Sequence, residues 1–146
     1  MDTIFSSRAW GIVWQYRATF INGLVNTLES AVVGLAIAMV IGLVLGLMAT
    51  SGKRAMTIPA RIYVEFFQNT PLILQVCFLY YALAYSGVKI SVVVVGFISL
   101  GLYHGAYVAE VVRAGIQSIP YGQFDAARSQ GFDYKDTMRH IILPQT

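Results

Sequence analysis

Residues 122–144 read GQFDAARSQGFDYKDTMRHIILP and form the long polar segment of an otherwise apolar chain. Helix-forming residues from 123 to 130 predict a short helix, and Gly131 is suited to end it because glycine adopts the left-handed conformation without strain. Asp133 predicts the N-cap of a second helix, which should run until Pro144 interrupts its hydrogen bonds. We expect this helix, bend and helix to lie outside the lipid.

The spacing within this stretch resembles that of the E-A-A loop of ABC importer permeases. That loop is matched by Asp125-Ala126-Ala127, Gly131, Ile141 and Leu143-Pro144, with Asp125 where the family usually has Glu. The resemblance implies that the first helix is a coupling helix, which lies in a cleft on an ATP-binding subunit. The residues assigned to coupling on this basis are Gln123, Asp125, Ala126, Ala127, Gly131, Ile141, Leu143 and Pro144. An ordinary cytoplasmic loop with some local helix is the alternative.

Composition points to a membrane protein. Of the 146 residues, 57% are hydrophobic and 12% are charged, whereas charged residues make up about a quarter of a soluble domain. The net charge of +3 comes from Lys and Arg that are scattered along the chain, so anionic lipid and membrane orientation explain it better than nucleic acid. Cys77 is the single cysteine, which excludes an internal disulfide.

Uncharged stretches predict an all-α, multi-pass membrane protein with three transmembrane helices. The spans are expected at about residues 24–50, 71–86 and 90–112, within a transmembrane domain covering 23–146. An N-terminal segment, 1–22, has Trp10, Trp14, Arg17 and Ile21 on one helical face and is expected to lie at the membrane interface. The cytoplasmic coupling-helix loop would occupy 120–144.

Two local patterns predict how these helices begin and pack. Small residues four apart run along the first span from Ser30 through Gly42 and Gly46 to Thr50, and such a stripe lets another helix approach closely. In the second span, Thr70 is expected to cap a helix whose first residue is Pro71.

Orientation follows from the cations in the short loops. If the E-A-A loop is cytoplasmic, seven cations lie inside and three outside, in agreement with the positive-inside rule. The inside set is Lys53, Arg54, Arg61, Arg113, Arg128, Lys135 and Arg139, and the outside set is Arg8, Arg17 and Lys89. The N-terminus is then outside, and a short basic loop at 52–62 is inside.

Polar groups inside the spans are the candidates for a substrate path, because burying them in lipid is costly. These candidates are Gln75, His104, Tyr107 and Glu110. Each has a structural alternative. His104 could be neutral and satisfied by one interhelical hydrogen bond, Glu110 could pair with Arg113, and Gln75 could join two helices.

Three stretches further resemble polar-amino-acid ABC importer permeases: 23–28 (GLVNTL), 65–75 (EFFQNTPLILQ) and 105–116 (GAYVAEVVRAGI). The resemblance implies a permease subunit of the bacterial inner membrane that couples ATPase motion to amino-acid translocation. The implied partners are ATP-binding subunits, a periplasmic or extracellular substrate-binding protein, and a second, identical or different, permease subunit. Gln68 stands where the family usually has Arg, so no role of that Arg is transferred.

Enzyme chemistry is not expected. The chain has no convincing catalytic triad, no metal-ligand spacing, and no sign of a cofactor. A phosphate-binding loop ending at Lys53 would need Gly at position 47 and Ser or Thr at 54, where Leu47 and Arg54 stand. ATP hydrolysis is therefore expected on a separate subunit.

The chain ends two residues after the motif, whereas the family usually has about five spans, with two after the E-A-A loop. We therefore expect the C-terminal spans to be missing. This leaves two alternatives to a permease subunit, which are a truncated fragment without transport, acting at most as an interaction module, and a small unrelated channel or scaffold.

Overall fold

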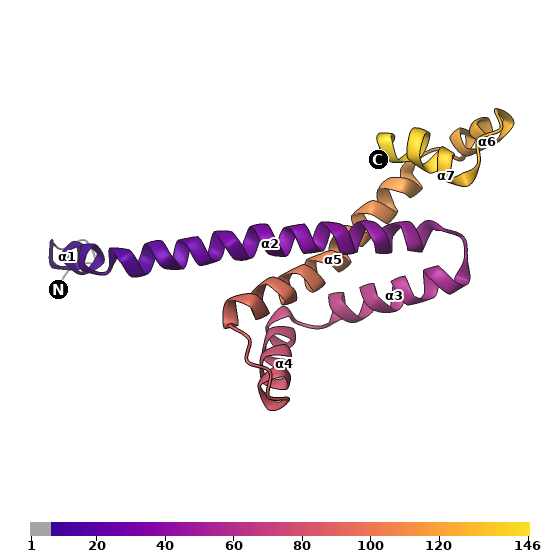
Figure 1. The fold of residues 1–146 in the computed structure, drawn as a ribbon. Coiled ribbons are helices and arrows are strands. Elements are labelled where there is room, and N and C mark those ends of the chain that lie inside the picture. The colour runs from indigo at the N-terminus through magenta and orange to yellow at the C-terminus, as the bar shows by residue number, and fades with distance from the viewer. Residues whose placement is uncertain (1–6) are drawn as a thin grey trace.

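The computed structural model describes residues 7–146, which form helices joined by short turns (Figure 1). The helices are α1 Ser7–Gln15, α2 Arg17–Thr50, α3 Arg54–Asn69, α4 Leu72–Tyr85, α5 Val92–Ser118, α6 Tyr121–Ser129 and α7 Tyr134–Thr137, followed by a π-helical segment η1 Met138–Ile142 and a 3-10 turn η2 Leu143–Gln145. The all-α prediction is confirmed for the described residues.

Two helices, α2 and α5, are long and apolar enough to cross a membrane. The helices α3 and α4 reach that length only together, and they are bent by 101° at the short break between them. The described chain therefore has two spans, or three if this bent pair counts as one. A membrane protein with helical spans is confirmed, and the count of three spans stays a prediction.

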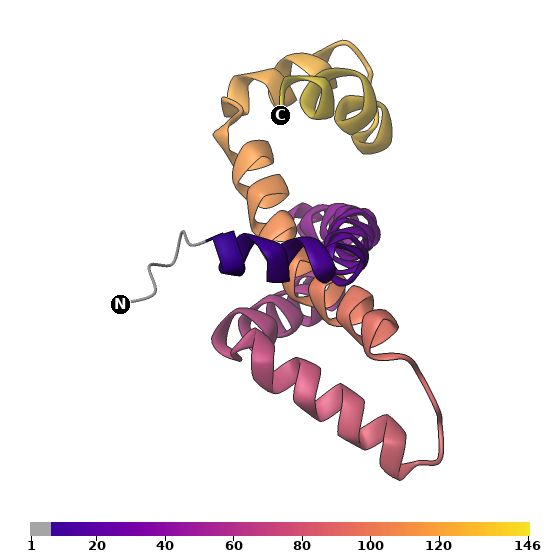
Figure 2. The same cartoon turned by 90° about the vertical axis from the view of Figure 1, so that its left-hand side faces the viewer.

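The helices α2 and α5 cross in close contact, as Figures 1 and 2 both show. The predicted small-residue stripe lies in this contact, where Gly34, Ala38, Gly42 and Gly46 are buried. A Cβ atom built on Gly42 would lie 2.4 Å from the Cβ of Val108. Glycine is therefore what allows the two backbones to approach, as the spacing predicted.

The approach is reciprocal, because α5 also places glycines against α2. A Cβ on Gly101 would meet Ile37 Cγ2 at 2.4 Å, and one on Gly105 would meet Ile41 Cγ2 at 3.0 Å. Large side chains of each helix thus occupy the gaps left by small residues of the other. The crossing angle and register are specified by this exchange.

The bend between α3 and α4 arises from Asn69-Thr70-Pro71. Thr70 is extended, with φ −108° and ψ 124°, because the proline ring disfavours a helical conformation at the preceding residue. The predicted N-cap is wrong: the Thr70 hydroxyl donates to the carbonyl of Phe66 at 2.8 Å, and α4 begins at Leu72 without a side-chain cap. Thr70 therefore closes α3 instead of opening α4.

The basic segment 52–62 is also not a loop, because α3 begins at Arg54. Ser51, Gly52 and Lys53 form the turn between α2 and α3, and Gly52 has a φ of +71°, which glycine adopts without strain. The residues from 54 onward form a strongly amphipathic helix, and the salt bridge between Arg61 Nε and Glu65 Oε1, at 3.2 Å, lies on its exposed side. The i,i+4 spacing of Arg61 and Glu65 is typical of one face of a helix, and this spacing is the signal that distinguishes the segment from a loop.

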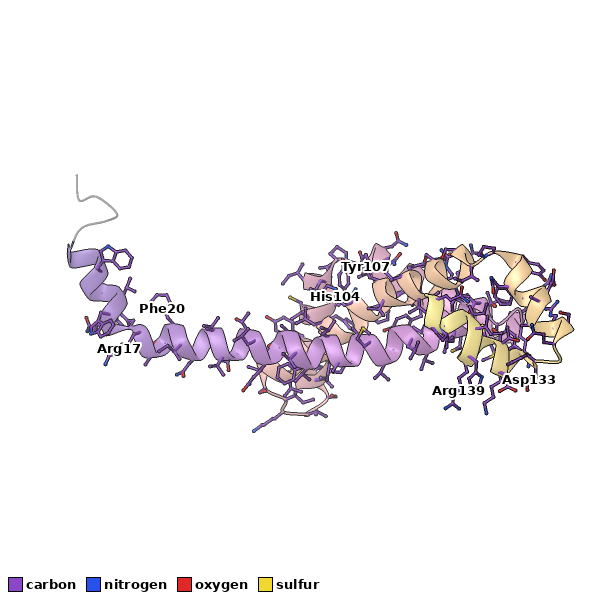
Figure 3. The ribbon with its side chains drawn as sticks, turned by 90° about the horizontal axis from the view of Figure 1, so that it is seen from above. Arg17, Phe20, His104, Tyr107, Asp133 and Arg139 are labelled. Atoms are coloured by element: carbon purple, nitrogen blue, oxygen red, sulfur yellow. The ribbon has the colours of Figure 1, made fainter. Side chains whose placement is uncertain are left out.

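Residues 7–22 do not form one continuous helical face. The helix is interrupted at Tyr16, so Trp10 and Trp14 lie on α1 whereas Arg17 begins α2. The guanidinium of Arg17 covers the break: its Nη1 donates to the Trp14 carbonyl at 3.0 Å, and its Cζ lies 4.9 Å from the Trp14 ring centroid (Figure 3). Residues 1–6 of the predicted interfacial segment lie outside the described part of the chain.

Candidate functional site

The polar motif folds into helix α6 and a second helix formed by α7 and η1, and this helix pair projects from the end of α5 on the side of α2 opposite to α3 and α4 (Figure 2). Helix α6 ends where the glycine was predicted to end it. Gly131 has a φ of +85°, and its N–H donates to the Arg128 carbonyl at 3.0 Å. The N–H of Phe132 donates to the Ala127 carbonyl at 3.1 Å, so the last carbonyls of α6 are satisfied by a glycine-centred C-cap.

The second helix is capped as the sequence indicated. Asp133 Oδ1 accepts from the Asp136 N–H at 2.7 Å, and the Asp133 carbonyl accepts from the Thr137 hydroxyl at 2.7 Å. The helix does not simply stop before Pro144, however. It widens into η1 and then tightens into η2, where Pro144 lies in the first turn and its missing N–H leaves no bond unmade.

An apolar cluster anchors the helix pair to the spans. Ile116 of α5 packs with Met138 and Ile142 of η1, and all three are buried. Leu47 of α2 and Phe124 of α6 pack against the same cluster, so it joins the motif to both long helices. The motif is therefore in direct packing contact with both α2 and α5.

The predicted coupling residues divide into anchors and surface. Ile141 and Leu143 pack against the apolar cluster, and Pro144 is exposed. Ile142, which the motif does not include, is 0% exposed and lies at the centre of the anchor. The spacing of Met138 and Ile142, four apart on a helix, is the signal that could have identified it.

On α6 the two motif alanines have different environments. Ala127 is 2% exposed, whereas its neighbour Ala126 lies on the exposed face with Gln123 and Asp125. Asp125 Oδ1 lies 3.9 Å from Arg128 Nη1 on the same face, and both side chains are well exposed, so this pair contributes little to stability. The face is open to a partner and contains an anion, a cation, an amide and a small apolar side chain.

The candidates for a substrate path lie in three places. His104 is exposed on α5 and lines a cavity of about 580 Å³ together with Asn26, Thr27 and Ser30 of α2. These three polar residues were not predicted as site residues. Their signal is a polar group at positions i, i+1 and i+4 of an otherwise apolar helix. The interhelical hydrogen bond considered as the structural alternative for His104 is not found among the described residues.

Tyr107 lies one turn along α5 from His104, and their ring centroids are 6.4 Å apart (Figure 3). Its hydroxyl is hydrogen-bonded to that of Tyr103 at 3.0 Å. Both hydroxyls and the imidazole can donate or accept a hydrogen bond. The cluster is therefore a surface that can exchange hydrogen bonds with a polar ligand.

Glu110 is neutralised by its neighbour. Both of its carboxylate oxygens lie 3.1 Å from the Nε of Arg113, which also donates through Nη1 to Gln117 Oε1 at 2.7 Å. This is the structural alternative considered for Glu110 from its spacing, and it leaves the carboxylate without a free charge to offer a substrate.

Gln75 lies apart from these residues, at the α3–α4 bend. Its Nε2 donates to the carbonyls of Phe67 at 3.2 Å and Thr70 at 2.9 Å, so the amide joins two helices. Its Oε1 is buried without a partner and lines a cavity of about 470 Å³. The same cavity is lined by Ser99, whose hydroxyl is also buried and unpaired. Within residues 7–146, no group of three His, Cys, Asp or Glu side chains could hold a metal ion.

These features define a class, namely a helical membrane protein in which a capped, exposed helix pair is anchored to two crossed spans. The chain belongs to the family of binding-protein-dependent transport system inner membrane components, whose model matches residues 38–146. The resemblance to importer permeases that the motifs indicated is thereby confirmed.

Named relatives agree with this assignment. The chain is 37% identical over 134 residues to a probable glutamine ABC transporter permease protein, GlnM, of Bacillus subtilis, covering 92% of this chain and 62% of the relative. It is 39% identical over 123 residues to a probable amino-acid ABC transporter permease protein, y4tG, of Sinorhizobium fredii, covering 84% and 53%. It is 40% identical over 126 residues to a putative glutamine transport system permease protein, GlnP, of Rickettsia felis, covering 86% and 58%.

A solved structure has the same fold. The crystal structure of an amino acid ABC transporter with histidines superposes with a TM-score of 0.80 at 36% identity, covering 91% of this chain and 62% of that one. The chain thus spans between 53% and 62% of the length of these relatives.

Proposed function

We propose that this chain is the membrane-spanning permease part of an ATP-driven importer for amino acids, and that α6 is the element that docks on an ATP-binding subunit. The observation that carries the docking role is the contrast between the two ends of the motif. The outer face of α6 is open, whereas η1 is buried against α5 through Ile142. An element that is exposed to a partner at α6 and packed against the spans at η1 is suited to transfer a movement of the partner to those spans.

The amino-acid substrate class is supported by the names of the relatives and by the polar surface on α2 and α5. The Asn26 amide and the His104 imidazole offer donors and acceptors in a cavity bounded elsewhere by Ala31, Leu35 and Leu100. The hydroxyls of Thr27 and Ser30 donate to carbonyls of α2 itself, at 2.9 and 2.7 Å, so in this cavity they act as acceptors. Such a mixture suits the ammonium and carboxylate groups of an amino acid. We propose that His104 and Tyr107 belong to the substrate path, whereas Glu110 and Gln75 shape the helices around it.

The remaining partners follow from the same proposal. Two ATP-binding subunits would dock on the α6 helices of two permease subunits, identical or different, and a substrate-binding protein would deliver the amino acid from outside. The motif would lie in the cytoplasm, because Lys53 and Arg54 follow the end of α2 and lie in grooves that the motif also lines. The N-terminus would then be outside, with the protein in the bacterial inner membrane.

The test is co-purification of the tagged 146-residue chain with the ATP-binding subunit of its transporter after co-expression and detergent extraction. Ala126→Glu places a charge on the exposed face of α6 without disturbing a packed side chain, and we expect it to reduce recovery at least about tenfold. Ala126→Ser is the matched control and should retain recovery.

Equal recovery of the subunit by the Glu and Ser variants would refute docking through this face. Absence of the subunit from the unaltered chain, with binding by a version extended to the length of the relatives, would favour a fragment that does not transport. A charge at Ala127 is a poorer test, because Ala127 is buried and the variant would also disturb the fold of the motif.

A further inference from the structure

The groove that contains Lys53 and the motif residues Lys135 and Arg139 has no binding role in the proposed function. It has a volume of about 650 Å³ and runs between α2, the start of α3, and the segment formed by α7 and η1. Its walls are apolar, with Val44, Leu47 and Met48 from α2, Met56 from α3 and Met138 from η1. Unbranched methionine side chains adapt to a flexible apolar ligand.

Three cations line this groove, and each comes from a different element. Lys53 is in the α2–α3 turn, Lys135 is in α7, and Arg139 is in η1, from which its side chain extends outward in Figure 3. None of the three takes part in the salt bridges found within residues 7–146, which use other cations. The groove residues include no Asp or Glu. Three positive charges therefore face the groove without an internal anion.

The groove lies at the level where a lipid headgroup would be. Lys53 follows Thr50, the last residue of the apolar helix α2, by three positions, so the cations lie just beyond the end of a span. The apolar walls continue from there along α2 toward Val44. A ligand that fits this arrangement has a negative charge at one end and a hydrocarbon chain that lies along the helix.

We propose that this groove binds an anionic phospholipid, with the phosphate between Lys53, Lys135 and Arg139 and an acyl chain along Val44, Leu47 and Met48. A free phosphate would satisfy the cations but would leave the methionine walls exposed. A zwitterionic lipid would bring its own ammonium group toward three cations. Only an anionic lipid complements both the charge and the apolar surface.

Binding there has a structural consequence. The lipid would connect the α2–α3 turn to α7 and η1, whereas the apolar cluster of Ile116, Met138 and Ile142 joins η1 to α5 and to Leu47 of α2 but includes no residue of that turn. It would therefore steady the motif against the end of the span. The inference rests on the membrane placement of α2 but not on the docking of an ATP-binding subunit, so the two can fail separately.

The test uses the purified 146-residue chain in neutral detergent and measures thermal unfolding with phosphatidylglycerol, phosphatidylcholine or soluble glycerol phosphate. We expect phosphatidylglycerol to raise the midpoint by several degrees and the other two to have little effect. The triple variant Lys53→Gln/Lys135→Gln/Arg139→Gln should lose that rise. The control Arg17→Gln/Arg61→Gln/Lys89→Gln removes the same charge elsewhere and should keep it.

Native mass spectrometry of the same samples should find one retained phosphatidylglycerol in the unaltered chain and in the control, and none in the triple variant. If the triple variant is unstable without lipid, the single variant Lys135→Gln provides the comparison, because it alters one exposed side chain. This variant should retain less phosphatidylglycerol than the unaltered chain. Equal protection by phosphatidylcholine would mean that only apolar contact operates, and equal protection by glycerol phosphate would mean a free-anion site. A dimeric chain without bound phosphatidylglycerol would mean that a second copy of the chain, and not a lipid, occupies the groove. Each of these results would overturn the proposal.

Discussion

The contact between α2 and α5 is the feature on which the rest of the structure depends, and Gly42→Ala tests it directly. The added Cβ would lie 2.4 Å from Val108 Cβ and 3.0 Å from the backbone nitrogen of Ala109. Carbon atoms normally approach to about 3.5 to 4.0 Å, so the helices would have to separate by roughly 1 Å. Neither neighbouring atom can rotate away, because one is backbone and the other is fixed to it.

The expected cost is the difference between two effects. Overpacking a close contact costs about 1 to 3 kcal/mol, and replacing Gly by Ala within a helix returns about 0.5 to 1 kcal/mol. Gly42→Ala should therefore destabilise the protein by up to about 2.5 kcal/mol. Gly23→Ala is the matched control on the same helix, because a Cβ there meets nothing within 4 Å. It should be neutral or slightly stabilising.

Thermal unfolding of both variants in the same detergent, followed by circular dichroism, measures the difference. The expected order of midpoints is Gly23→Ala at or above the unaltered chain, and Gly42→Ala below it. If Gly42→Ala were as stable as Gly23→Ala, the close approach of α2 and α5 would not hold in the folded protein.

Three further predictions concern single contacts. Gly131→Ala places a side chain at φ +85°, which should destabilise the C-cap of α6 by about 1 to 3 kcal/mol and so speed hydrogen exchange of the amides at the end of that helix. Gly122→Ala is the control, because its Cβ would lie in open space, and it should leave this exchange unchanged. Equal exchange rates in the two variants would contradict the cap. Asp133→Ala removes the acceptor for the Asp136 N–H and should destabilise the start of α7 by about 1 kcal/mol in the same measurement, with Asp133→Asn as the control that retains an acceptor. Ser99→Ala removes a buried hydroxyl without a partner and should raise the unfolding midpoint, by a change worth about 1 kcal/mol; a lower midpoint would mean that the hydroxyl is satisfied in the folded protein.

Local features were predictable wherever a single residue type satisfies a single backbone requirement. Gly131 ends α6 and Asp133 caps α7, because a left-handed conformation and an N-terminal acceptor are needs that few residues meet. The same reasoning was wrong at Thr70. Its hydroxyl could bond forward to α4 or backward to α3, and the bend at Pro71 decided between them.

The sequence by itself determined the membrane class, the two long spans, the small-residue stripe and the polar motif, because each depends on composition or on periodicity within one segment. The tertiary structure decided what those segments do together. It buried Ala127 and left Ala126 open. It brought His104 of α5 to the same cavity as Asn26 of α2, and it brought Lys53 to the same groove as Lys135 and Arg139. Such outcomes depend on which faces of different helices meet, and no local pattern specifies that.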